Sequence, residues 1–145
     1  MPAARIAIVV SRFNQEVTSG LLRGAIAHLK ENGVSVPEGD IFSAPGAFEI
    51  PLIAQTLARS GRVDGVVCLG CVIKGDTAHF EYISHAASTG LMQASLATGV
   101  PLTFGILTTY DDEQAVLRSR DDAHNKGREA AAACLEALAT LERVR

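Results

Sequence analysis

A histidine and the short polar segment before it are the residues of this sequence best suited to chemistry. His79 follows Gly75-Asp76-Thr77, which joins an apolar run to a helical pattern. At such a connection, backbone N–H groups and the Thr77 hydroxyl can point at an anion. The segment is not a P-loop, because Asp76 stands where that motif needs its lysine. His79 alone could be a surface or capping residue, but beside an anion it could transfer protons near neutral pH.

A basic cluster in the last third of the chain is a second candidate for anion binding. Arg118, Arg120 and Lys126 lie close together in the sequence. Arginine binds phosphate well because its guanidinium group offers two parallel hydrogen bonds. Asp121 and Asp122 lie in the same stretch, so the cluster could equally be a solvated and neutralised surface. The spacing of these residues leaves both interpretations open.

Two further candidates follow the first two apolar runs of the chain. Phe13 is a large apolar residue in a polar segment, where stacking on a ligand and covering the end of a sheet are equally plausible. The segment around Phe13 lacks the glycine fingerprint of a dinucleotide site. Glu49 follows Pro45-Gly46-Ala47-Phe48, and taken alone it suits the first turn of a helix, where the helix dipole favours an acidic residue.

The three cysteines indicate neither a disulfide framework nor a metal site. Cys68 and Cys71 form a C-x-x-C pair, but they lie in an expected strand, where residues three apart point to opposite faces. The two thiols should therefore not meet. Cys134 is expected in the core, and no histidine stands at a metal-ligand spacing from a cysteine. An odd number of cysteines in a small chain suits a reducing cytoplasm.

Length and composition favour one globular domain spanning residues 1–145. Hydrophobic residues make up 48% of the 145 residues, which is close to the globular average. The net charge of −3 argues against a nucleic-acid-binding protein, which normally carries a basic stripe. No apolar stretch reaches the length of a signal peptide core or of a membrane span. We therefore expect neither nucleic acid nor membrane as a partner.

Four apolar runs alternate with segments of helical periodicity. The expected strands cover residues 5–10, 40–44, 63–69 and 102–107. Most of these runs are nearly continuous in apolar residues, which is typical of parallel strands buried on both faces. The expected helices cover about 17–32, 48–60, 80–96, 111–118 and the stretch from Lys126 onward.

This alternation predicts a three-layer α/β/α domain with a four-stranded parallel sheet. Ligands of such sheets bind beyond the carboxyl ends of the strands. The segments that follow the strands are therefore the expected place for chemistry. They cover residues 11–15, 45–49, 70–79 and 108–111.

Several blocks of sequence, read in order, carry a family resemblance. They are Ser11–Asn14, Pro45–Pro51, Gly70–Tyr82, Phe104–Thr109, Glu113–Ala115 and Asn125–Gly127. Together they resemble the lumazine synthases and cover the chain from residue 5 to the last helix. The resemblance implies a flavodoxin-like sheet, the condensation of a ribitylamino-pyrimidine with a butanone phosphate, and active sites shared between subunits.

The resemblance also implies a role for each matching residue. Phe13 would stack on the pyrimidine, and His79 would transfer the proton. The other pyrimidine-binding residues would be Ala47, Phe48, Glu49, Cys71, Val72, Ile73 and Phe104. The butanone phosphate would be bound by Asp76, Thr77, Arg118 and Lys126, with Phe104 and Arg118 supplied by an adjacent subunit. No cofactor and no metal are expected.

The same resemblance implies a homopentamer and, in some relatives, a shell of sixty chains. Lys74 replaces a common arginine but keeps its charge, so we expect little consequence from it. Residues 120–124 stand where many relatives carry a glycine-bearing turn, and this turn is charged. We therefore expect pentamers as the minimum unit, with a shell less favoured. Two other interpretations remain: an archaeal-type riboflavin synthase, which needs no phosphate site, and a non-catalytic flavin-binding or shell-forming protein of the same fold.

Overall fold

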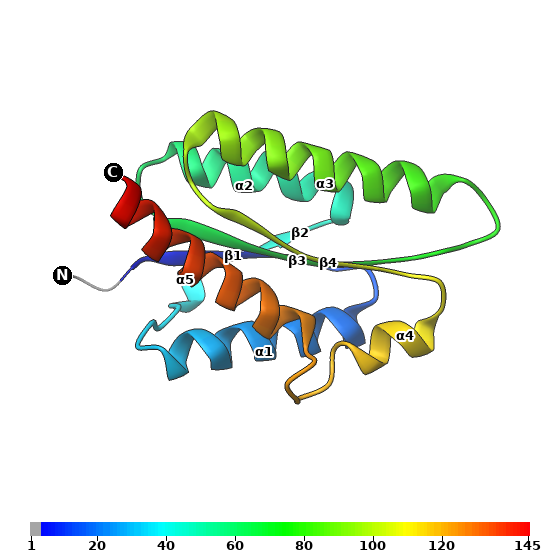
Figure 1. Ribbon diagram of the computed structural model, residues 1–145. Helices are drawn as coiled ribbons and strands as arrows, with labels where there is room; N and C mark the ends of the chain where they lie inside the picture. Colours follow the sequence, from blue (N-terminus) through cyan, green and yellow to red (C-terminus); the bar gives the residue numbers. More distant parts are fainter. Residues whose placement is uncertain (1–3) are drawn as a thin grey trace.

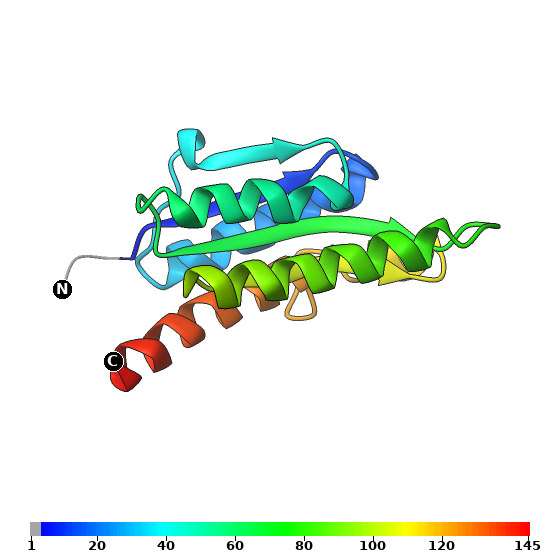
Figure 2. The same cartoon turned by 90° about the horizontal axis from the view of Figure 1, so that it is seen from above.

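Four parallel strands form the central sheet, in the order β2-β1-β3-β4. The computed structural model of the chain describes residues 4–145 (Figure 1). The strands are β1 (Ile6–Ser11), β2 (Ile41–Ala44), β3 (Gly65–Ile73) and β4 (Leu102–Thr109). All pairings are parallel, and the arrows of β1, β2 and β3 point the same way in Figure 2, so the carboxyl ends of the strands meet at one edge of the sheet. The strand order reverses beside β1, where ligands of such sheets bind.

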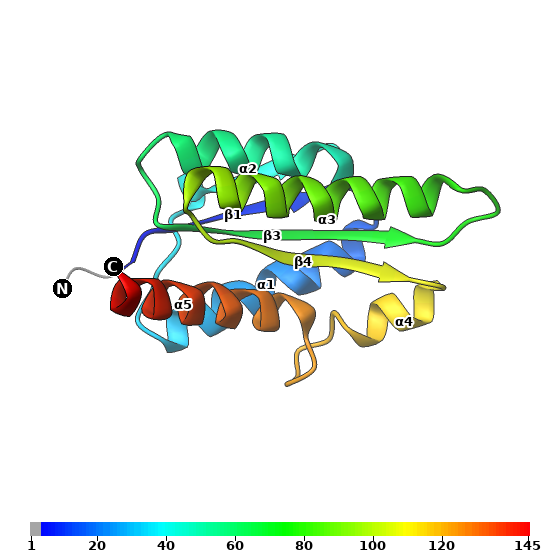
Figure 3. The same cartoon turned by 45° about the horizontal axis from the view of Figure 1, so that its top comes forward.

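Helices cover both faces of the sheet, as Figure 3 shows. One face carries α2 (Ile50–Arg59) and α3 (His79–Thr98), and the other carries α1 (Gln15–Glu31) and α5 (Lys126–Val144). The shorter elements are η1 (Glu38–Asp40), η2 (Ala47–Glu49) and α4 (Asp112–Leu117). The predicted three-layer α/β/α fold is confirmed, and its strand order is that of a flavodoxin-like sheet.

The core consists of two apolar clusters, one on each side of the sheet. Alternate residues of β3 enter different clusters, because successive side chains of a strand point to opposite faces. Cys68 packs on the α2–α3 side, whereas Cys71 and Cys134 pack on the α1–α5 side. All three cysteines are buried and unpaired, so the two thiols of the C-x-x-C pair do not meet.

Two strands are longer than the sequence predicted. The strand predicted to end at residue 69 continues to Ile73, and the one predicted to end at residue 107 continues to Thr109, because the two ends pair with each other. Gly70 does not break β3. It is buried there, and a Cβ at this position would lie 2.9 Å from the Ser11 hydroxyl oxygen. The expected loop 70–79 therefore shrinks to residues 74–78, which extend beyond the sheet in Figure 2.

The helices follow the expected spacing. Asp111 caps α4 by accepting a hydrogen bond from the Gln114 N–H, and Asn125 caps α5 in the same way through the Arg128 N–H. The second expected helix begins as the 3-10 turn η2, and α2 itself starts at Ile50. Among residues 4–145, no helix is long and apolar enough to cross a membrane.

Candidate active site

Most of the predicted site residues lie at the carboxyl edge of the sheet, on β1, β2 and β3 or just after them. We call this set the sheet-edge group: Phe13, Ala47, Phe48, Glu49, Cys71, Val72, Ile73, Asp76, Thr77 and His79. Phe13 follows β1, and η2 follows β2. The last members of the group end β3, occupy the 74–78 loop or begin α3.

Asn14 fixes the loop that carries Phe13. Its backbone is left-handed, with φ 59°, a conformation that asparagine tolerates better than most residues. Its side-chain amide donates a hydrogen bond of 3.2 Å to the carbonyl of Cys71, and its own carbonyl accepts from the N–H groups of Val17 and Thr18. The loop is thereby tied to both β3 and the start of α1.

The side chains of Phe13 and Glu49 both lie close to Gly46. A Cβ on Gly46 would lie 3.1 Å from the Phe13 ring and 3.4 Å from a carboxylate oxygen of Glu49. Glycine at this position therefore lets an aromatic ring and a carboxylate approach the same stretch of backbone. Phe13 is 69% exposed and Phe48 is 59% exposed, so both rings face outward.

Four members of the sheet-edge group can offer a ligand mainly their backbone. Ala47, Cys71 and Val72 are buried, and Ile73 is half-buried. Burial, and after it the charge of Asp112, raises the pKa of the Cys71 thiol to about 11, so this thiol is protonated at neutral pH. Cys71 is therefore not a nucleophile in this structure.

The loop between β3 and α3 is exposed and carries the polar end of the sheet-edge group. Asp76, Thr77 and His79 are all exposed. The Thr77 hydroxyl oxygen accepts a hydrogen bond of 3.3 Å from the backbone N–H of His79. The hydroxyl proton remains available as a donor to an anion. The N-terminus of the twenty-residue helix α3 adds positive potential at the same place.

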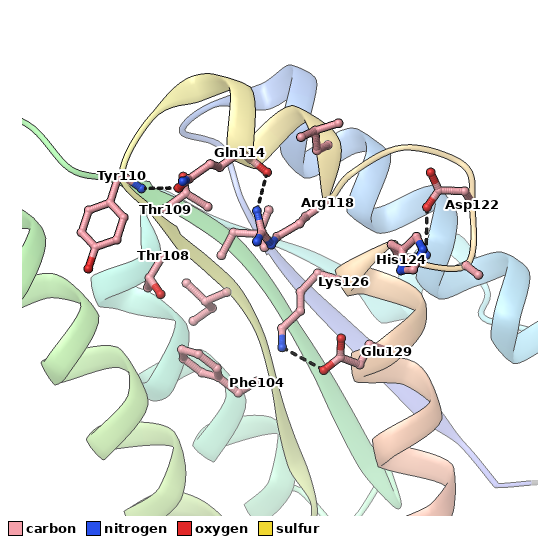
Figure 4. Close-up of a pocket in the computed structure, with 14 residues that line it drawn as sticks. Phe104, Thr108, Thr109, Tyr110, Gln114, Arg118, Asp122, His124, Lys126 and Glu129 are labelled. Atoms are coloured by element: carbon pink, nitrogen blue, oxygen red, sulfur yellow. Dashed lines mark hydrogen bonds and ion pairs between the residues drawn. The ribbon is translucent and has the colours of Figure 1, made fainter.

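The remaining predicted residues, Phe104, Arg118 and Lys126, line a cavity of about 830 Å³ (Figure 4). We call it the β4 pocket. Its walls come from β4, α4, the α4–α5 turn (residues 118–125) and the first turn of α5. In Figure 4, Arg118 and Lys126 point into the same space beside Phe104. The structure thus brings together residues that are up to 22 positions apart in the chain.

The two cations of the β4 pocket differ in their partners. Lys126 forms an ion pair of 3.1 Å with Glu129, three residues along the same helix. The guanidinium of Arg118 donates only to the Gln114 carbonyl, at 3.2 Å, and it has no carboxylate partner among residues 4–145. Arg118 is therefore the cation that is more available to an incoming anion.

Sequence reasoning missed Tyr110 and His124, which also line the β4 pocket. Tyr110 follows β4 directly, is 69% exposed, and lies 5.5 Å from the Lys74 ammonium and 6.4 Å from the Phe80 ring. An exposed aromatic residue immediately after a strand is a signal that could have identified it. His124 carries no local signal of this kind, because only the folded turn brings it to the pocket that Arg118 also lines.

The two sets of residues do not share a cavity within the described chain. No member of the sheet-edge group lines the β4 pocket. Among residues 4–145, no three His, Cys, Asp or Glu side chains are grouped so that they could hold a metal ion. The fold defines an α/β protein of the flavodoxin-like class, with one aromatic and one cationic surface at the carboxyl ends of its strands.

The comparison with protein families gives the particular family. Residues 3–142 match the model of the family described as 6,7-dimethyl-8-ribityllumazine synthase. The match covers nearly the whole chain, and the relatives agree with it. The chain belongs to the 6,7-dimethyl-8-ribityllumazine synthase family.

Three relatives illustrate the similarity. The 6,7-dimethyl-8-ribityllumazine synthase 1 of Caulobacter vibrioides is 69% identical over 141 residues, which cover 97% of this chain and 92% of the relative. The synthase of Salinibacter ruber is 50% identical, with 94% and 87% covered. The synthase of Nitratidesulfovibrio vulgaris is 48% identical, with 97% and 90% covered. The family resemblance inferred from the sequence motifs is confirmed.

Proposed function

We propose that this chain, as one domain over residues 1–145, is a transferase acting in riboflavin biosynthesis. It condenses 5-amino-6-(D-ribitylamino)uracil with 3,4-dihydroxy-2-butanone 4-phosphate, giving 6,7-dimethyl-8-ribityllumazine, phosphate and water. The observation that carries the proposal is the presence of two unlike surfaces in a member of this family. One is aromatic and hydrogen-bonding, and the other is cationic.

The sheet-edge group suits the pyrimidine. The exposed ring of Phe13 offers a flat apolar face for stacking, and the Glu49 carboxylate beside it can accept hydrogen bonds from ribityl hydroxyls. The backbone of Cys71, Val72 and Ile73 supplies further donors and acceptors at the end of β3. We propose that Phe48 and the Ala47 backbone complete this half, and that Phe104 covers the ring from another subunit.

The butanone phosphate requires cations and hydrogen-bond donors. We propose that Asp76 and Thr77 hold this substrate near the N-terminus of α3, while Arg118 of an adjacent subunit grips its phosphate. Lys126 then supports Arg118, although its ion pair with Glu129 must loosen before it can contribute a full charge. Arg118 should therefore carry more of the phosphate affinity than Lys126.

The proposed reaction needs positioning, one proton shuttle and a path for phosphate to leave. The amine of the pyrimidine attacks the ketone and water is lost; the phosphate is then eliminated. The second nitrogen closes the ring with loss of another water. His79 directly follows the 74–78 loop, which carries Asp76 and Thr77, and there its imidazole can move protons near neutral pH. No step changes a redox state, and we propose that no cofactor takes part.

We propose that the active unit is a homopentamer in the cytoplasm. Its support is the division of the site into two surfaces, together with the exposure of Phe13, Phe48, Leu52 and Tyr82 at 59–74%. Closed cyclic symmetry would make every shared site equivalent. The α4–α5 turn is charged, which opposes the dry burial that ring-to-ring contacts of a shell require. We therefore expect pentamers without a shell.

The test is to incubate the purified protein with both substrates and follow the fluorescence of the lumazine. Lumazine should form only when both substrates are present. Turnover of lumazine alone would support the riboflavin synthase alternative, and ligand binding without turnover would support a non-catalytic protein. Native mass spectrometry should show five copies of the 15.2 kDa chain, about 76 kDa. An active monomer would contradict the shared site.

A further inference from the structure

Asn125 is the buried polar side chain at the centre of the α4–α5 turn. It is 1% exposed and uses both ends of its carboxamide. The nitrogen donates to the carbonyls of Gly20 on α1, at 3.1 Å, and of Arg120 in the turn, at 2.8 Å. The oxygen accepts from the Arg128 N–H at 3.1 Å and so caps α5. One side chain thus bonds α1, the turn and α5.

The surface of α1 is shaped to receive this turn. A Cβ on Gly24 would overlap the Asn125 carboxamide, and a Cβ on Gly20 would overlap the carbonyl of Ser119. Both glycines are buried. The absence of side chains at these two positions lets the backbone of the turn lie directly against the helix. The seat of the turn is therefore defined by close packing as well as by hydrogen bonds.

The two cations of the β4 pocket stand at the two ends of the seated turn. The backbone N–H of Lys126 donates to the carbonyl of Arg118 at 2.8 Å, so the two residues are tied to each other. Asn125 precedes Lys126 directly and bonds the carbonyl two residues after Arg118. A shift of the carboxamide would therefore move both cations together.

We infer that Asn125 is a positioning residue for phosphate binding: by docking the α4–α5 turn on α1, it sets where Arg118 and Lys126 stand in the β4 pocket. The inference rests on the proposed role of these two cations. Asn125 is not among the residues that line the β4 pocket, so its carboxamide does not contact a ligand bound there. Its effect must pass through the backbone of the turn.

The test separates docking from helix capping. Asn125→Ser keeps a hydroxyl oxygen that can cap α5 but loses the carboxamide nitrogen that donates to both Gly20 and Arg120. Because a misplacement of about 1 Å can cost up to roughly a hundredfold in a positioned site, the KM for the butanone phosphate should rise at least about tenfold. The KM for the pyrimidine should stay close to that of the unmodified chain. Gly24→Ala, which pushes on the carboxamide without removing it, should act in the same direction.

Leu29→Ala is the matched control, because it opens a cavity in the same α1–α5 layer but away from the turn. It should lower stability without separating the two KM values. If Asn125→Ser raised both KM values equally, or if it behaved like Leu29→Ala, the docking role would be wrong. Native mass spectrometry of each variant excludes loss of assembly as the cause.

Calorimetric titration with inorganic phosphate distinguishes this inference from the proposed function. The unmodified assembly should bind phosphate, Arg118→Ala should abolish that binding, and Asn125→Ser should weaken it. Equal phosphate affinity for the unmodified chain and Asn125→Ser would overturn the positioning role alone. Absence of phosphate binding by the unmodified assembly would overturn the proposed phosphate site, and the positioning role with it.

Discussion

The sheet-edge group and the β4 pocket differ in their exposure to solvent and in the kinds of side chain that they present. The sheet-edge group presents aromatic rings and a carboxylate on an exposed surface, with Phe13 and Phe48 more than half exposed. The β4 pocket is a cavity with two cations, walled by an edge strand and two helices. The sheet-edge group contains no lysine or arginine, whereas the β4 pocket contributes two cations and also carries the aromatic side chains of Phe104 and Tyr110. The cations that a phosphate requires therefore come only from the β4 pocket.

The strand order explains why the two surfaces are divided. The sheet-edge group lies at the ends of β1, β2 and β3, whereas the β4 pocket opens beside β4, one of the two outer strands of the sheet. Tyr110 stands at the boundary, because it lines the pocket and also contacts Lys74 and Phe80. An edge strand can face a second copy of the chain, so a complete site is best explained by an assembly.

The largest expected effect tests this division directly. Phe13→Asp disables the sheet-edge group and Arg118→Glu disables the β4 pocket, and both positions are exposed, so folding should survive. Each variant alone should be inactive. Random co-assembly of equal amounts should restore about one quarter of the full activity, since a quarter of shared sites receive two intact halves.

The matched control for this mixture is the double variant assembled with the unmodified chain. Shared sites again predict about one quarter of the activity, whereas sites within single chains predict about one half. For the mixture of the two single variants, sites within single chains predict no activity at all. The pair of mixtures therefore distinguishes the two arrangements without reference to absolute rates.

The next largest effect concerns His79, the proposed proton shuttle of the sheet-edge group. His79→Ala should lower kcat by about a hundredfold, the low end for general acid–base help, because positioning carries much of this condensation. Both KM values should change little. His85→Ala, an exposed histidine on the same helix, is the control and should leave kcat intact. A His79→Ala enzyme with normal kcat across the neutral pH range would remove His79 from the mechanism.

Within the β4 pocket, the two cations should differ. Arg118→Ala should raise the KM for the butanone phosphate at least about tenfold, because it removes a charge-assisted hydrogen bond. Lys126→Ala should raise it by less than about fivefold, since Glu129 already neutralises this cation and exposed ion pairs contribute little. Arg120→Ala, whose side chain does not line the pocket, should have no effect. The KM for the pyrimidine should be the same in all three variants, which would show that these cations act only on the phosphate substrate.

The sequence predicted the elements well because their periodicity is local. Apolar runs and helical periodicity identified each strand and long helix. The helix expected from residue 111 is present as α4, which Asp111 caps. The ends of β3 and β4 were wrong because they depend on pairing with each other. Gly70 follows the predicted end of this strand, but it lies within β3, where the Ser11 hydroxyl leaves no room for a side chain.

The candidate site was predictable only in part. The family motifs named its residues, but the roles assigned to them remain predictions. The ion pair of Lys126 with Glu129 was accessible from its three-residue spacing on a helix. In contrast, Tyr110 contacts Lys74, and Asn125 donates a hydrogen bond to Gly20. Both interactions join segments that are distant in the sequence, so no local pattern reveals them.

The smallest expected effect lies at the other end of the sheet, away from both surfaces. Asp40, just before β2, accepts two hydrogen bonds of 3.1 Å from Arg5, just before β1. These hydrogen bonds hold the pKa of Asp40 below its ordinary value, against the opposing effect of burial. Because the folded-state pKa is lowered, the pair stabilises the fold above the unfolded pKa of about 3.9 and loses this contribution as the pH falls through the lowered value.

Asp40→Asn should therefore lower Tm by a few degrees at pH 7 without changing either KM. The difference from the unmodified chain should stay constant between about pH 5 and 8 and shrink below about pH 4. Thermal unfolding at fixed chain concentration measures this difference in Tm, since the stability of an assembly depends on concentration. Glu38→Gln, in the same short helix, is the control and should have no such pH dependence. If Asp40→Asn changed a KM instead, the amino-terminal end of the sheet would be coupled to the site, and the separation of binding from scaffold would be wrong.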